Sequence, residues 1–355
     1  MKKILLQVPS RPLGNNRMFG PDINNVTETW RMLRDKLQFL GYEFTTADSN
    51  SVEGCGWILF LNAESVSNEH KKSWKWRLKK ILGLKLPQIW PKRELVTEAE
   101  KLSMSDKLVF LIMEGKVICP RNYDPALWKH FNRILTWDDD IIDNKKFFKV
   151  HHPSATSKPI RNNRTFSERK FLVNIITNKT SSLPLELYTA RRNTITYFDA
   201  NYPEHFDLFG IYWNQPITKW QKRIPWLVKK YKKFQGEVPN KINTLSQYKF
   251  ALCYENTEQN GYITEKIFDA LAAKTVPIYL GAPNVADYID EDVFIDRRKF
   301  KNEKELADYL FSVTEERYNE YLCAIERFLQ SEKYKKFLPE NFAETITKVL
   351  NLTKD

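Results

Sequence analysis

The chain has 355 residues, of which 42% are hydrophobic, and its 56 Lys and Arg against 44 Asp and Glu give a formal net charge of +12. This length suits two domains, and the hydrophobic share allows substantial cores, so composition excludes a globally disordered chain. A basic chain suits a nucleic acid, an anionic membrane or a phosphorylated substrate. Because the basic residues are spread widely and no nucleic-acid-binding motif occurs, nucleic acid is the weakest of these three partners.

The sequence begins MKKILLQVPSRP, whose apolar run is too short for a signal peptide or an anchor, and no window approaches the length of a membrane span. The four cysteines form no C-x-x-C motif, which predicts reduced thiols and neither a zinc site nor disulfides. We therefore expect a cytoplasmic protein, with any membrane contact peripheral and at the inner face.

The first part of the chain alternates strand and helix patterns. Lys3–Val8, Tyr42–Ala47 and Trp57–Leu61 are apolar runs of strand length, and Asn25–Leu40 carries an apolar stripe at helical spacing. Such an alternation is typical of a parallel α/β sheet.

Residues 71–90, KKSWKWRLKKILGLKLPQIW, are basic and rich in Trp, and their spacing allows an amphipathic helix. One interpretation is attachment to an anionic bilayer surface or to a lipid-linked acceptor. The other is an ordinary domain helix whose basic face is solvated.

The run Lys107–Met113, KLVFLIM, predicts a buried strand, and Glu114 follows it directly. The carboxyl end of such a strand faces the ligand-binding edge of an open α/β sheet. A carboxylate at this position can take a proton from a reacting hydroxyl group. The alternative is a surface glutamate that merely ends a strand.

Ala126–Ile134 predicts a helix, and three adjacent aspartates, Asp138 to Asp140, follow it. A D-x-D pattern can chelate the metal that bridges a nucleotide diphosphate. Because the pattern is common by chance, a turn or a helix cap is the favoured interpretation.

Residues 152–167, HPSATSKPIRNNRTFS, are rich in Ser, Pro, Asn and Arg and predict a linker. We therefore divide the chain into a first Rossmann-like domain at 1–151, this linker, a second Rossmann-like domain at 168–313 and C-terminal helices at 314–355.

The second half continues the alternation. Glu186–Phe198 predicts a helix, Phe206–Gly210 a strand, and the basic and aromatic stretch Trp220–Phe234 a surface helix. Residues 314–350 are predicted helical, with an apolar stripe. Within them, residues 329–342 (LQSEKYKKFLPENF) offer Lys and aromatic side chains for contact with a membrane or an acceptor.

Residues 249–281 predict a strand, a polar loop, a helix and a second strand. Phe250–Tyr254 and Thr275–Leu280 are the two apolar runs, Glu255–Gly261 is the polar loop, and Thr264 can cap the helix. A βαβ unit of this kind makes its strands parallel and places the loop and the helix start at the carboxyl edge of the sheet, where ligands bind.

The residue types at this edge suit a nucleotide-sugar. The free N–H groups of a helix start attract an anion such as a phosphate, and Lys266 adds a mobile cation in the first turn. Glu265 can accept two hydrogen bonds from a ribose diol, and Asn256 and Tyr262 offer neutral polar contacts. There is no Walker-type lysine, which argues against an NTPase. The alternative is a capped amphipathic helix with a solvated Glu and Lys.

The stretch YENTEQNGYITEKIFDALAAKTVPIYLGAPNV resembles the donor-binding signature of the α-1,3-fucosyltransferases, glycosyltransferase family 10. That signature has an aromatic residue followed by Glu-Asn, then Tyr-Val-Thr-Glu-Lys, an apolar helix, and Val-Pro with a later Gly. Here Tyr254 replaces the usual Phe and Ile263 the usual Val. The similarity extends closely through Asp296 and loosely back to about residue 105, and the first hundred residues carry little of it.

The resemblance implies an α/β fold with two Rossmann-like domains facing across a cleft, of the GT-B type. It also implies an inverting, metal-independent α-fucosyltransferase that requires no cofactor and uses GDP-fucose as donor. In this family a helix arginine contacts the donor diphosphate, and the spacing assigns this role to Arg191, with Arg192 as the competitor. Asn256, Tyr262, Glu265 and Lys266 complete the expected donor site. Glu114 is expected to be the catalytic base.

The acceptor implied by the resemblance is a surface glycan, modified at O3 or O4 of GlcNAc, with residues 1–151 on the acceptor side. Expected partners are GDP-fucose, an oligosaccharide or lipid-linked glycan, and a membrane surface reached through 71–90 and the C-terminal helices. Two alternatives stay open. One is a GT-B transferase that uses another nucleotide-sugar, and the other is a glycan- or membrane-binding protein without turnover.

Overall fold

A computed structural model describes residues 2–21, 27–66, 93–153, 160, 162 and 164–352. Contacts divide the chain into two compact units, the first comprising Met1–Ala155 with Pro339–Asp355 and the second Thr156–Leu338. The predicted basic segment 71–90 lies outside the described residues, as does part of the predicted linker 152–167. Among the helices that are described, none is long and apolar enough to cross a bilayer.

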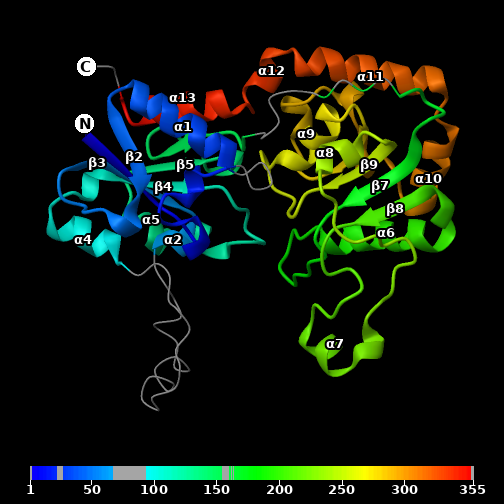
Figure 1. The fold of residues 1–355 in the computed structure, drawn as a ribbon, viewed down its shortest axis with the longest axis horizontal. Coiled ribbons are helices and arrows are strands. Elements are labelled where there is room, and N and C mark those ends of the chain that lie inside the picture. The colour runs from blue at the N-terminus through cyan, green and yellow to red at the C-terminus, as the bar shows by residue number, and fades with distance from the viewer. Residues whose placement is uncertain are drawn as a thin grey trace. The chain divides into compact units, whose positions relative to one another are not determined.

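The first unit is built on a parallel sheet with the strand order β2-β1-β3-β4-β5-β6 (Figure 1). Helices cover both faces of this sheet. The strands are β1 (Lys2–Gln7), β2 (Tyr42–Thr46), β3 (Cys55–Leu61), β4 (Leu108–Ile112), β5 (Arg133–Thr136) and β6 (Phe147–Lys149), and the helices are α1 (Thr27–Phe39), α2 (Ala63–Val66), α4 (Leu95–Lys101), α5 (Pro125–Trp128) and α13 (Pro339–Val349).

Strand β4 shows why its sequence is an unbroken apolar run. Val109 and Leu111 face the core shared with α1 and α13, while Leu108, Phe110 and Ile112 face the core shared with α2 and α4. A strand buried on both faces has no solvent side to carry polar residues. This burial positions the carboxyl end of β4, where Glu114 follows.

Helix α13 belongs to the first unit although it is the last helix of the chain. Its apolar face packs on α1, with the rings of Trp30 and Phe342 5.7 Å apart and nearly perpendicular. The core of this unit is therefore completed by a segment that the sequence groups with the preceding C-terminal helices.

The second unit contains another parallel sheet, with the order β11-β10-β9-β7-β8. Its strands are β7 (Lys170–Ile175), β8 (Phe206–Phe209), β9 (Tyr248–Tyr254), β10 (Val276–Leu280) and β11 (Ile295–Asp296). Its helices are α6 (Tyr188–Asn201), α7 (Lys219–Arg223), α8 (Lys241–Leu245), α9 (Glu265–Ala272), α10 (Glu303–Ser312), α11 (Glu315–Leu329) and α12 (Glu332–Lys335). The strand order reverses direction between β7 and β9, which is where open α/β sheets bind ligands.

Two predicted helices are wrong. The helix expected over Ala126–Ile134 ends at Trp128, because Ile134 pairs with β4 and lies in the buried strand β5. The surface helix expected over Trp220–Phe234 ends at Arg223, since Pro225 cannot donate the next helical hydrogen bond, and a short 3-10 turn, Pro225–Leu227, follows.

Candidate functional site

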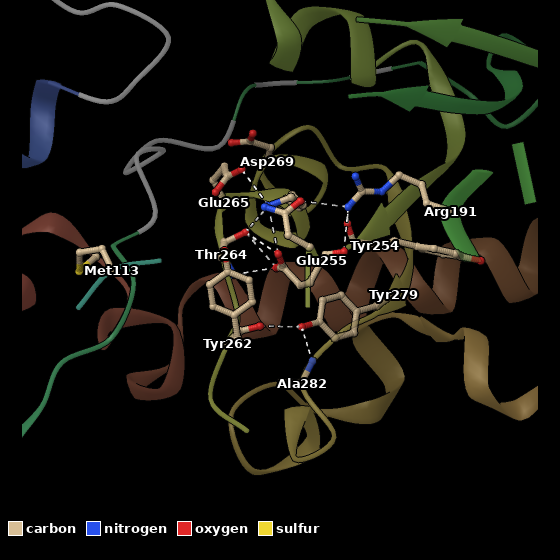
Figure 2. Close-up of polar contacts among 12 residues, drawn as sticks. Met113, Arg191, Tyr254, Glu255, Tyr262, Thr264, Glu265, Asp269, Tyr279 and Ala282 are labelled. Atoms are coloured by element: carbon tan, nitrogen blue, oxygen red, sulfur yellow. Dashed lines mark hydrogen bonds and ion pairs between the residues drawn. The ribbon is translucent and has the colours of Figure 1, made fainter. Parts of the chain in front are cut away.

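The predicted βαβ unit is present, and its loop gathers polar side chains at the carboxyl edge of the second sheet. Strand β9 ends at Tyr254, the loop runs through Gly261, and α9 begins at Glu265 with Thr264 in the N-cap position. Figure 2 shows Glu255, Thr264 and Glu265 converging there, with Arg191 reaching the same loop from α6. The site therefore draws residues from β9, α6 and α9, as the sequence predicts.

Glu255 is the centre of this cluster, although no sequence pattern assigned it a role. Its side chain is fully buried. The Oε1 atom accepts hydrogen bonds from the backbone N–H of Thr264 at 2.8 Å and from the Thr264 hydroxyl at 2.9 Å. A carboxylate therefore already lies at the start of α9, where the sequence predicts that a ligand's phosphate would meet the helix. Thr264 uses its hydroxyl to hold Glu255, not to cap the helix.

Lys266 is held in place by Glu255, so the expectation of a mobile cation is wrong. Its side chain is only 9% exposed, and Nζ lies 3.0 Å from Glu255 Oε2 and 2.8 Å from Thr264 Oγ1. Burial alone would lower the pKa of Lys266, but the nearby carboxylates outweigh it and the pKa lies above its ordinary value. A buried carboxylate requires such a partner, which is why this lysine is not free to move.

Arg191 holds the same loop by donating hydrogen bonds to the loop's backbone. Its Nη2 donates to the carbonyl oxygen of Tyr254, to that of Glu255 at 2.8 Å, and to Asn256 Oδ1 at 3.4 Å. Burial lowers the pKa of this guanidinium, and Glu255 opposes the shift. Within the described part of the chain its Nε atom has no hydrogen-bond partner.

Arg192 points elsewhere. It donates to the Lys179 carbonyl oxygen at 2.7 Å and to Thr189 Oγ1 at 3.2 Å, both outside the cluster. Of the two adjacent arginines that the sequence left as competitors, the structure places Arg191 in the cluster with Asn256.

The remaining predicted residues differ in accessibility. Glu265 is the accessible acid, with 41% of its side chain exposed and one oxygen 3.3 Å from Lys266 Nζ. Asn256 is half-buried. Tyr262 is buried, and its carbonyl oxygen accepts a hydrogen bond from Tyr279 Oη at 3.3 Å. Its ring is therefore part of the support of the loop.

Gly281 allows this packing. A Cβ atom there would lie 2.3 Å from Tyr279 Oη and 2.6 Å from Glu255 Cγ. Any larger residue would displace the buried carboxylate or the tyrosine beneath it. Sequence reasoning missed the roles of Glu255, Tyr279 and Gly281, although Glu255 follows an apolar strand just as Glu114 does.

Glu114 lies at the carboxyl edge of the first sheet, two residues after β4 ends at Ile112. Asn62, at the end of β3, accepts hydrogen bonds at Oδ1 from the backbone N–H groups of Met113 at 2.9 Å and Glu114 at 3.0 Å. The fully buried Asn122 donates to Asn62 Oδ1 at 3.0 Å and to the Glu114 carbonyl oxygen at 2.8 Å. The backbone of Glu114 is thus fixed by two amides, while its side chain is half-buried.

One of the three aspartates, Asp138, is a cap, as the favoured interpretation predicts. Asp138 is the N-cap of a 3-10 turn, Asp139–Ile141, and accepts the backbone N–H of Asp140 at 3.1 Å. Asp139 pairs with Lys149 at 2.5 Å. Burial raises the pKa of Asp138. Throughout the residues that the structure describes, no group of three His, Cys, Asp or Glu side chains is arranged to hold a metal ion.

The four cysteines are free, as predicted, and Cys55, Cys119 and Cys253 are buried. Burial, reinforced by the nearby Glu64, raises the pKa of the Cys119 thiol to about 12. Reduced, unreactive thiols therefore lie in both units.

Comparison with known proteins bears on the second unit most directly. Residues 219–345 match the family model "Glycosyltransferase family 10 (fucosyltransferase) C-term". The chain resembles the family 10 fucosyltransferases. An α-(1,3)-fucosyltransferase from Helicobacter pylori is 51% identical over 73 residues, and an α-(1,4)-fucosyltransferase from Arabidopsis thaliana is 48% identical over 66 residues. These stretches cover 21% and 19% of this chain but only 15% and 16% of the two relatives.

Solved structures support the fold over almost the whole chain. An α1,3-fucosyltransferase with GDP matches with a TM-score of 0.52 and 17% identity, covering 99% of this chain and 90% of the other. A DNA-modifying β-glucosyltransferase matches with a TM-score of 0.54 and 13% identity, covering 99% and 100%. At such identities the likeness concerns the fold alone, and it confirms the predicted GT-B class.

Proposed function

We propose that this protein is an inverting fucosyltransferase that moves L-fucose from GDP-fucose to O3 or O4 of a GlcNAc residue in a surface glycan. The observation that carries the proposal is the family 10 match over 219–345, because this range contains the cluster of Glu255, Glu265 and Lys266. The solved relative that contains GDP-fucose has the same fold, which is consistent with this donor. The cytoplasmic location expected from the sequence stays a prediction.

The donor contacts proposed for this chain combine one accessible acid, a loop amide and two buried cations. Glu265 presents a carboxylate, 41% exposed, that can accept both hydroxyl groups of the ribose, and the half-buried Asn256 lies on the loop that precedes α9. Arg191 and Lys266 are the cations proposed to meet the diphosphate. Tyr262 holds the loop in shape from beneath.

The cluster is formally neutral before any ligand binds. The cations Arg191, Lys241 and Lys266 are matched by the anions Glu255, Glu265 and Asp269, with Lys241 and Asp269 paired at 2.7 Å. The cluster therefore has no excess positive charge with which to attract a donor diphosphate. It would instead bind the diphosphate through hydrogen-bond donors that are held pointing toward it, and such fixed donors act most strongly where little water is present. The buried Arg191, whose Nε has no hydrogen-bond partner among the residues that the structure describes, is the most direct source of such a donor.

The proposed reaction has one displacement step. The Glu114 carboxylate takes the proton of the acceptor hydroxyl as that oxygen forms a bond to the anomeric carbon of fucose. The bond from that carbon to the β-phosphate oxygen breaks, and its electron pair leaves with GDP. Attack opposite to the leaving group inverts the anomeric configuration. Arg191 and Lys266 stabilise the charge that develops on the diphosphate, and we propose that no metal ion is required.

A donor and acceptor screen tests this proposal. The full chain is incubated with GDP-, UDP- and CMP-sugars and an array of GlcNAc-containing glycans, and release of the nucleoside diphosphate is measured. We expect turnover with GDP-fucose, an α-linked product by NMR, and thermal stabilisation by GDP alone among the free nucleotides. Preference for a UDP-sugar would favour the rival transferase. Thermal stabilisation by GDP-fucose with neither transfer nor hydrolysis would favour a binding protein without turnover.

A further inference from the structure

A long basic segment of the second unit connects β8 to α8. We call residues 211–236 the basic arm. Figure 1 shows α7 within it, at the end of loops that extend away from β7 and β8. The arm's base is anchored: Trp213 is buried, donates from Nε1 to the Ile176 carbonyl oxygen at 2.7 Å, and packs edge-on against Tyr231 with ring centroids 5.1 Å apart.

The basic arm has charges of only one sign. It contains seven basic residues and neither Asp nor Glu, the basic residues being Lys219, Lys222, Arg223, Lys229, Lys230, Lys232 and Lys233. All but Lys233 are exposed, and Lys233 pairs at 3.2 Å with Glu204, which lies outside the arm. Asp199 on α6 accepts the backbone N–H groups of Lys232 and Lys233, so this acid holds the arm's backbone. Lys230 donates to the Asn214 carbonyl oxygen at 2.9 Å and Lys229 lies over the Tyr231 ring, so the exposed cations offered to an anionic partner are Lys219, Lys222, Arg223 and Lys232.

Large apolar side chains lie among these charges. Trp226 is 83% exposed, Trp220 68% and Leu227 51%. Trp226 and Leu227 are adjacent on the short turn Pro225–Leu227, which fixes their backbone. Clustered exposed apolar residues with a polar surround mark an interaction site on a protein surface.

We propose that the basic arm binds the surface of an anionic lipid bilayer. Trp side chains favour the headgroup region, where the ring is apolar and its N–H stays hydrated, and Lys and Arg around them attract anionic lipids. A single-stranded nucleic acid would also use cations and aromatic rings, but it lies in a groove and stacks its bases on ring faces. The aliphatic Leu227 offers no face on which a base can stack, and the arm extends away from β7 and β8. A bilayer surface is therefore the better fit.

This assignment differs from the two membrane contacts expected from the sequence. The segment 71–90 lies outside the described residues. In the C-terminal helices, Tyr334, Phe337 and Phe342 are buried in the protein cores, so these aromatic side chains have no surface to offer a membrane. Within the described residues, the basic arm exposes both apolar rings, Trp220 and Trp226, and several cations.

Vesicle co-sedimentation of the full chain, without any donor sugar, tests the proposal. Phosphatidylcholine vesicles are compared with vesicles that also contain phosphatidylserine, for the natural protein and for the double variant Trp226→Ser/Leu227→Ser. We expect binding to the anionic vesicles only, and a fall of about tenfold in the partition coefficient for the double variant. The matched control Phe39→Ser, which changes a residue 65% exposed in the first unit, should bind as the natural protein does.

Charge is tested separately with Lys222→Gln/Arg223→Gln against the control pair Lys301→Gln/Lys336→Gln. The arm pair should lower the partition coefficient by about tenfold at low salt, and the control pair by much less. Unchanged thermal midpoints show that the variants fold. Equal binding of natural protein and arm variants, equal binding to uncharged vesicles, or retention on single-stranded DNA without vesicle binding would each overturn the proposal. Because no sugar transfer is measured, these outcomes are independent of the proposed enzyme activity.

Discussion

Glu114 and Glu255 lie at the carboxyl edges of two different sheets, and different groups hold them. Each follows the carboxyl end of a buried parallel strand, β4 in the first unit and β9 in the second. Around Glu114, neutral amides from Asn62 and Asn122 hold the backbone and the side chain is half-buried. Around Glu255, Thr264 and Lys266 hold the carboxylate itself, which is fully buried.

The comparison teaches what each carboxylate can do. A carboxylate that is buried in an ion pair is committed to its partner, and it serves to hold structure. Amides that fix the backbone of a carboxylate residue define the position from which its side chain acts. The half-buried Glu114, at the carboxyl edge of the first sheet, is the proposed base, and the buried Glu255 is suited to position Lys266 and the start of α9.

The sharpest test of this difference is Glu114→Gln. We expect transfer of fucose to fall by about 10²- to 10⁴-fold, because the amide cannot accept the acceptor's proton. GDP binding, measured by calorimetry, and the thermal midpoint should not change. Substantial residual turnover would remove Glu114 as the base.

Breaking the buried pair should instead cost stability. Lys266→Met leaves Glu255 charged and unpaired, and Glu255→Gln leaves Lys266 without its main partner, so each should lower the free energy of unfolding by about 3–5 kcal/mol. The double variant should lose less than the sum of the two. Additive losses in chemical denaturation would show that the pair is not coupled.

Lys266 also makes this stability depend on pH. Its pKa is raised in the folded state, so its contribution is full below the unfolded pKa of about 10.4 and is lost as pH rises through the folded value. A Lys266 variant could lose GDP binding because it unfolds. The thermal midpoint of the variant is therefore measured alongside its GDP affinity.

The variant Asn62→Ala tests whether Asn62 positions Glu114, and we expect a smaller effect than that of Glu114→Gln. The variant removes the acceptor for the N–H groups of Met113 and Glu114, which should cost about 1–3 kcal/mol of stability and lower kcat while the KM for GDP-fucose is unchanged. Asp143→Ala is the matched control, because Asp143 also accepts backbone N–H groups in the first unit, from residues 145–147. If both variants lower kcat equally, Asn62 has no positioning role.

The smallest expected effect is that of EDTA. Cations of the protein lie at the carboxyl edge of the second sheet, and Asp138 and Asp139 are engaged in a cap and an ion pair. The transfer rate should therefore be unaltered by the chelator. A large loss that manganese restores would return the aspartate triplet to the site.

Local sequence patterns predicted the strands around both sites because a parallel strand buried on two faces must be apolar along its length, as β4 and β9 are. They failed where tertiary pairing decided the outcome. Ile134 fits the helical pattern of the residues before it but lies in β5, because its apolar run pairs with the edge of β4. Likewise, no pattern shows that α13 returns to complete the core around α1.

Local patterns in the chain were enough to predict the α/β class, the βαβ unit at 249–281 and the residues gathered at its loop, since strand burial, helix spacing and the order of the loop residues are local properties. The folded arrangement was needed to show that Glu255 already occupies the helix start, that Lys266 is fixed and that Arg191, not Arg192, reaches the loop. The reason is physical: whether a charged side chain is free or paired depends on groups brought beside it by burial, and these lie on other elements of the fold.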